Sequence, residues 1–137
     1  MTIRIEEDRH PDGTLWDRSY YCDDLLHRED GPAYELFNKN TTRASCIWYI
    51  RGKRHREDGP AHEIFSFDGT LTYCAWYIDN KLHRNDGPAK EHFSSDGRRT
   101  GAAYYLNGNR FSKPEYHRQV ALSKLAITIA PDCGVFL

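Results

Sequence analysis

A seven-residue string recurs three times in this chain and constrains its fold more than any other feature. It reads HREDGPA at 27–33 and 55–61 and HRNDGPA at 83–89, so the copies stand 28 residues apart. A long string repeated at one fixed spacing indicates a repeat architecture, in which each unit packs against its neighbours. The sequence therefore predicts one structural unit that is used several times.

Aromatic pairs follow the same spacing. They lie at 20–21, 48–49 and 76–77, seven residues before each repeated histidine, and a fourth pair lies at 104–105. In that fourth unit Phe111 takes the histidine position, and FSKPEY replaces the string. A changed last unit is typical of a terminal, capping repeat. We predict a single domain over 1–137, with units at about 5–32, 33–60, 61–88 and 89–111 and a C-terminal cap at 112–137.

Within each unit, local patterns predict two strands. An alternating segment such as Ala61-His62-Glu63-Ile64-Phe65 leads to a turn such as Asp68-Gly69, and a segment rich in β-formers follows at 70–78. Asp-Gly between such segments is a strong hairpin signal. We therefore expect an all-β fold in which about eight strands form one twisted antiparallel sheet, a solenoid of hairpins.

Period-two alternation predicts two aromatic ladders on opposite faces of the sheet. The first packs into a thin core with Phe37, Phe65 and Phe93 and consists of Tyr20, Trp48, Trp76 and Tyr104. The second presents its phenols as the predicted partner-binding surface and consists of Tyr21, Tyr49, Tyr77 and Tyr105. Tyrosine is enriched at interfaces because it combines apolar area with a polar tip. The alternative is a partly exposed strand face that reflects β-propensity alone.

The C-terminal segment predicts a helix. Ser112-Lys113-Pro114-Glu115 fits a capping box, and the helix is expected from about 113 to about 127, ending before Pro131. It is expected to cover the open edge of the last hairpin with a buried stripe of Leu122, Leu125, Ala126 and Ile129. The first hairpin has no such cap unless residues 1–8 fold over it, and this open end would permit a homodimer.

Charge and cysteine usage limit the partners. The formal net charge of −1 argues against nucleic acid, and no run approaches the roughly 18 apolar residues of a membrane span. The N-terminus has no apolar segment of a signal peptide. Cys46 and Cys74 occupy equivalent positions two strand spacings apart, about 9–10 Å, which is too far for a disulfide. Free thiols and a cytoplasmic location are therefore predicted.

The repeated string has two interpretations. As a ligand site it would hold a phosphate-bearing anion or a metal ion with the side chains of His27, Arg28, His55, Arg56, His83 and Arg84. As a structural element, its aspartate would accept hydrogen bonds within its own turn, its arginine would pair with that aspartate or a glutamate, and its histidine would bond a backbone carbonyl. No metal site or cofactor is predicted, because positions about 10 Å apart cannot converge on one ion.

No catalytic residue is predicted. P-loop, GxGxxG, HExxH and GxSxG patterns are absent from the sequence. Cys46 and Cys74 are interpreted as small core residues rather than nucleophiles. The repeated glutamates are expected to pair with basic side chains across strands, and they are Glu35, Glu63 and Glu91.

The segment 48–61, WYIRGKRHREDGPA, resembles the MORN-variant repeat arrays common in bacteriophage and giant-virus proteins. The resemblance covers about residues 12–118 and implies a solenoid of β-hairpins without implying a reaction. Related MORN repeats are similar in architecture and serve as protein- or lipid-binding scaffolds. The resemblance also favours a viral origin.

The predicted function is that of a non-enzymatic binding protein. It would be phage-encoded and would dock a host macromolecule, such as a defence component that it inhibits, through its aromatic face in the host cytoplasm. The alternative is a sponge for a small ligand such as a nucleotide, held by the repeated Arg and His with Tyr stacking on the base.

Overall fold

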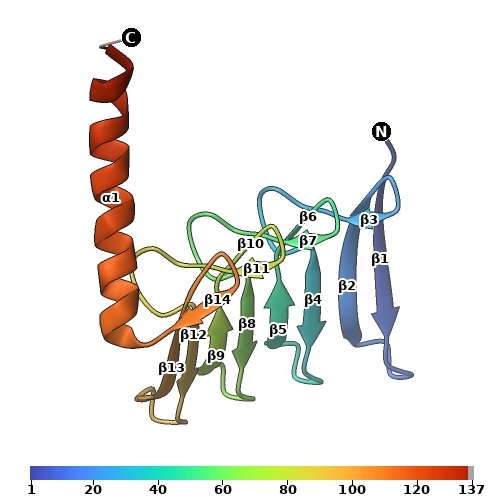
Figure 1. Ribbon diagram of the computed structural model, residues 1–137. Coiled ribbons are helices and arrows are strands. Elements are labelled where there is room, and N and C mark those ends of the chain that lie inside the picture. Colours follow the sequence, from blue (N-terminus) through green and yellow to red (C-terminus); the bar gives the residue numbers. More distant parts are fainter. Residues whose placement is uncertain (136–137) are drawn as a thin grey trace.

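Successive strands of the chain pair as antiparallel hairpins and build one open sheet (Figure 1). The computed structural model describes residues 1–135, and the side chains of residues 1–126. Ten strands form the main sheet: β1 (Ile3–Arg9), β2 (Leu15–Cys22), β3 (Leu25–Leu26), β4 (Tyr34–Phe37), β5 (Arg43–Ile47), β8 (His62–Phe65), β9 (Leu71–Ala75), β12 (Lys90–Phe93), β13 (Arg99–Leu106) and β14 (Asn109–Phe111). The prediction of an antiparallel, hairpin-built β fold with a C-terminal helix is confirmed. The sheet stays open and does not curl (Figure 1).

Short hairpins lie beyond the main sheet. β6 (Tyr49–Ile50) pairs with β7 (Lys53–Arg54), and β10 (Tyr77–Ile78) pairs with β11 (Lys81–Leu82). Their turns have positive φ at both central residues, 49° and 79° at Arg51-Gly52 and 47° and 69° at Asp79-Asn80. These are the conformations that two-residue hairpins favour.

The strand expected over residues 70–78 ends at Ala75 in the main sheet. Trp48 and Trp76 stand outside the strands, because the chain leaves the main sheet there and enters the short hairpin. Each tryptophan amide instead donates to a carbonyl that follows the repeated Gly-Pro, as Trp76 does to Ala89 at 2.7 Å. The side chain of Tyr77 packs against Ala61 and Ala75 and is only 8% exposed, so the face expected to present phenols is buried at this position.

The core is thin and uses small residues. Ala33, Ala61 and Ala89 are fully buried, and so is Ala75, which clusters with Tyr77. Cys46 and Cys74 are buried free thiols and Cys22 is a half-buried one, as predicted. Cys133 lies outside the described side chains.

The helix α1 (Lys113–Val135) stands away from the sheet instead of covering its edge (Figure 1). Its first turn is anchored by Tyr116, which is 1% exposed and whose hydroxyl donates to the Arg84 carbonyl and accepts from the Gly87 amide at 3.1 Å. The predicted stripe is wrong, because Leu122, Leu125 and Ala126 are exposed. Ile129 lies outside the described side chains, and the helix continues past Pro131. Among the described residues, no helix is both long and apolar enough to cross a membrane.

Truncating Tyr77 is expected to destabilise the fold. Tyr77→Ala should lower the free energy of unfolding by about 3 kcal/mol, because it empties the cluster that Tyr77 shares with Ala61 and Ala75. The matched variant is Tyr49→Ala, at the half-buried equivalent position one hairpin earlier, and it should cost clearly less. Urea unfolding compares the two, and equal losses would contradict the assigned burial.

Candidate functional site

Each repeated string forms a loop that is held by its own arginine. The Arg56 guanidinium carbon lies 4.0 Å from the centroid of the Trp48 ring. Its Nε donates to the Asp58 carboxylate at 3.0 Å, and its Nη1 donates to the Pro60 carbonyl at 3.1 Å. The loop wraps so closely that a Cβ at Gly59 would lie 2.8 Å from the guanidinium carbon. A side chain at Gly59 would therefore displace the Arg56 guanidinium from its place on the Trp48 ring.

The other two loops repeat this arrangement. Arg28 stacks on Tyr20 at 4.1 Å and Arg84 stacks on Trp76 at 4.0 Å, each with the same aspartate and proline-carbonyl bonds. Each arginine also faces the glutamate seven residues later, at 3.7 Å for Arg28 with Glu35. All three guanidiniums therefore have internal partners, as the structural interpretation of the string predicts, and this disfavours the nucleotide-binding alternative.

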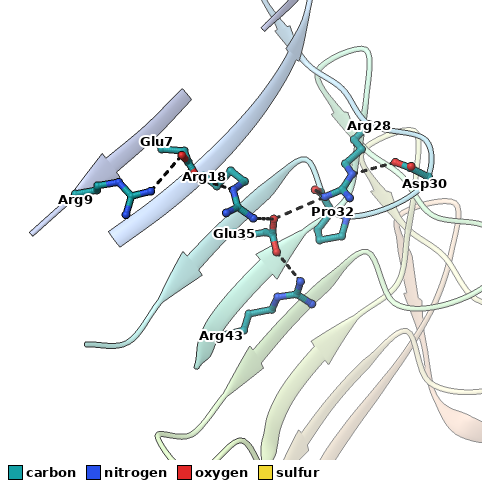
Figure 2. Close-up of polar contacts among 8 residues, drawn as sticks. All are labelled: Glu7, Arg9, Arg18, Arg28, Asp30, Pro32, Glu35 and Arg43. Carbon is teal, nitrogen blue, oxygen red and sulfur yellow. Dashed lines mark hydrogen bonds and ion pairs between the residues drawn. The ribbon is translucent and has the colours of Figure 1, made fainter. Parts of the chain in front are cut away.

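Glu35 is the most buried of the repeated glutamates, with 3% of its surface exposed, and Figure 2 shows the arginines around its carboxylate. Its Oε2 accepts from Arg43 at 2.5 Å, and its Oε1 faces Arg28 at 3.7 Å and Arg18 at 3.8 Å. Arg18 also donates to Glu7 at 2.9 Å. This network ties β1, β2, β4, β5 and the first loop together. The predicted cross-strand pairing is confirmed here.

The other repeated glutamates contact a basic side chain and a thiol. Glu91 pairs with Arg99 at 3.2 Å, again across strands, and Glu63 pairs with Arg56 at 3.7 Å. Each also accepts a hydrogen bond from a thiol, Cys46 to Glu63 and Cys74 to Glu91, both at 3.7 Å.

The repeated histidines join each loop to the next hairpin. Nδ1 of His27 accepts a hydrogen bond from the Arg51 amide at 3.0 Å, and Nδ1 of His55 accepts one from the Asp79 amide at 3.1 Å. His83 does the same with the Asn107 amide at 3.0 Å. The predicted bond to a carbonyl is wrong, because the turn of the next hairpin directs an N–H group, not an oxygen, at the imidazole. The histidine acts as an acceptor, which requires that its Nδ1 carry no proton.

Shallow grooves lie beside the loops. Their volumes are about 570, 620 and 480 Å³, and each has one aromatic residue of the first ladder in its lining, in order Tyr20, Trp48 and Trp76. The prediction that this ladder is core is therefore wrong in part, because its members are half-buried and reach a groove. The sequence did carry a signal for the stacking of these aromatic residues on arginine, because each of them precedes the arginine of the repeated string by eight positions.

The middle groove is the most acidic of the three. It is lined by Glu29 and Asp30 from the first loop and by Glu57 and Asp58 from the second, against one arginine, Arg56. The four carboxylates are between 83% and 88% exposed.

The tyrosine ladder does not form a continuous exposed row. Arg4 lies 4.5 Å from the ring centroid of Tyr21, and Arg54 lies 4.0 Å from that of the buried Tyr77. Tyr21, Tyr49 and Tyr105 are half-buried. The prediction of a phenol face is therefore wrong at Tyr77, whereas the other three positions retain some accessible surface.

The buried thiols are poor nucleophiles. Burial, aided by the neighbouring Glu63 carboxylate, raises the pKa of Cys46 to about 11. Burial beside Glu91 raises the pKa of Cys74 to about 12. A thiol with such a pKa holds little thiolate near neutral pH, and the thiolate is the reactive form. Among the described residues, no group of three or more His, Cys, Asp or Glu side chains is placed to hold a metal ion.

Comparison with protein-family models, curated proteins and solved structures gives no match for this chain.

Replacing a repeated histidine tests its acceptor role. His55→Ala should lower the free energy of unfolding by about 1–2 kcal/mol, because the Asp79 amide loses its partner. His55→Asn places a carbonyl oxygen near the same point and should recover part of that loss. Thermal unfolding at pH 8 compares the variants, and equal losses for both would contradict a specific acceptor role.

Proposed function

We propose that this chain is a non-enzymatic binding protein that docks a protein partner along the grooves beside the three loops of the repeated string, at 27–33, 55–61 and 83–89. The observation that supports this is the recurrence of a groove with the same kind of aromatic lining at three successive loops. Equivalent points of successive units stand two strand spacings apart, about 9–10 Å. An extended segment of a partner can therefore contact several grooves at once, and the small binding free energies of the separate contacts then sum.

Charge and shape favour a basic partner segment. The middle groove has exposed carboxylates on both sides and an apolar wall at Ile50. The aliphatic part of a lysine or arginine can pack on Ile50 while its charged end meets Glu29 or Glu57. One exposed ion pair contributes only about 0–1 kcal/mol, so the repetition of the groove is essential to the proposal.

The resemblance to viral repeat arrays supports a host protein as the partner. A component of host defence that the binding inhibits, in the host cytoplasm, is the biological role we propose. The half-buried Tyr21, Tyr49 and Tyr105 are the competing surface for the same role, because the tyrosine ladder was predicted as the partner site.

Two point variants separate these surfaces. Glu57→Lys reverses a charge that lines two grooves at once, and it should lower capture of the partner from host lysate at least tenfold. Tyr49→Ala should leave capture within twofold. Ser95→Lys, in an exposed turn of the β12–β13 hairpin, is the control for added positive charge. Bound proteins are quantified by mass spectrometry against an empty resin.

Each outcome decides a different point. Loss with Glu57→Lys alone supports the grooves. Loss with Tyr49→Ala alone overturns the grooves and supports the tyrosine surface. Retention of the same partner by both variants overturns both assignments.

A further inference from the structure

The strand β1 forms one edge of the sheet, at the end away from the helix (Figure 1). It is seven residues long, contains no proline and pairs with β2 on its inner side. Ile3 and Ile5 are 75% and 56% exposed, and Met1 beside them is 94% exposed. A long edge strand with exposed apolar side chains is a template for pairing with another chain.

The backbone groups that face outward from β1 can be assigned. The Asp23 amide donates to the Thr2 carbonyl at 2.8 Å, which marks Thr2 and Asp23 as a hydrogen-bonded pair. Such pairs alternate along an antiparallel ladder, so the backbone groups of Arg4 and Glu6 also face β2. The N–H and C=O groups of Ile3, Ile5 and Glu7 therefore point away from the sheet.

We propose that β1 pairs in antiparallel fashion with β1 of a second copy of this chain, with Ile5 on the twofold axis. In this register Ile5 lies opposite Ile5 of the other copy, and Arg4 lies opposite Glu6 in both directions. Opposite charges and apolar pairs directly across an antiparallel ladder stabilise it. One surface patch then serves both copies, as in a twofold dimer.

The neighbouring registers are unfavourable. Outward-facing residues must oppose outward-facing residues, and a shift of the axis by one residue places it on Arg4 or on Glu6. The first places Arg4 opposite Arg4, and the second places Glu6 opposite Glu6, and like charges directly opposite one another are destabilising. The charges on β1 thus favour the register centred on Ile5 over its two neighbours. This edge lies apart from the middle groove, whereas Met1 and Ile3 also line the first groove. The dimer proposal does not depend on the proposed function.

Charge reversal tests the register. Arg4→Glu and Glu6→Arg should each raise the dimer dissociation constant at least tenfold, because each makes two like-charge pairs. A mixture of the two variants should form a heterodimer, because both pairs are then complementary, and the variant with both changes should again self-associate. Native mass spectrometry over a concentration series gives the populations.

Several results would overturn the proposal. They are a wild-type chain that stays monomeric up to about 100 μM, single variants that dimerise like the wild type, or a mixture with no heterodimer. Circular dichroism of each variant shows whether it is folded.

A thiol pair gives a second test that leaves these charges intact. Ile5→Cys should form an intermolecular disulfide on mild oxidation, because Cα atoms of a hydrogen-bonded pair lie about 5.5 Å apart, within disulfide range. Ile3→Cys is the matched control, because its two copies would stand four residues apart along the ladder, about 13 Å. Peptide mapping identifies the linked thiols. Cross-linking of both variants alike, or of Ile3→Cys alone, would contradict the register.

Discussion

The arginine of each repeated loop stacks on the aromatic residue eight positions before it, and this contact holds the loop against the rest of its unit. A single open sheet has no second layer to bury its face, and the fully buried side chains here are mostly alanine. The loop that carries Arg56 supplies part of the missing cover, since its guanidinium lies on the Trp48 ring and bonds its own loop. A cation on an aromatic face contributes about 0.5–2 kcal/mol, and the same contact is made at all three loops. The histidine of the same string then joins the loop to the next hairpin.

Much of the fold could be predicted from local patterns. The strand positions follow from period-two alternation, and the turn at Arg51-Gly52 follows from residues that tolerate positive φ. Glu35 and the buried thiols also lie where alternation places them. These features depend on neighbours within one hairpin or on the adjacent strand, and such neighbours are encoded by spacing.

The features that could not be predicted depend on longer-range geometry. Alternation does not say which face of the sheet is covered: the chain leaves the main sheet at Trp48 and Trp76, and Tyr77 packs with Ala61 and Ala75 instead of presenting its phenol. The helix was expected to pack because Leu122 and Leu125 share one face. Tyr116 anchors only its first turn, and the helix then points away from the sheet. The partner of each histidine lies 24 residues away, in the turn of the next hairpin. Residue spacing alone does not determine how closely that turn approaches the histidine.

The central claim is that the repeated string is a scaffold that shapes the grooves. Hydrogen exchange of Arg56→Ala tests it most directly, because the His55 amide bonds the Trp48 carbonyl and the Arg56 amide bonds the Tyr77 carbonyl, both at 3.1 Å. The account predicts faster exchange at residues 55–61 and at the Asp79 amide, with little change in the first loop at 27–33. Unchanged exchange at residues 55–61 would contradict it, because the arginine would then not hold the loop.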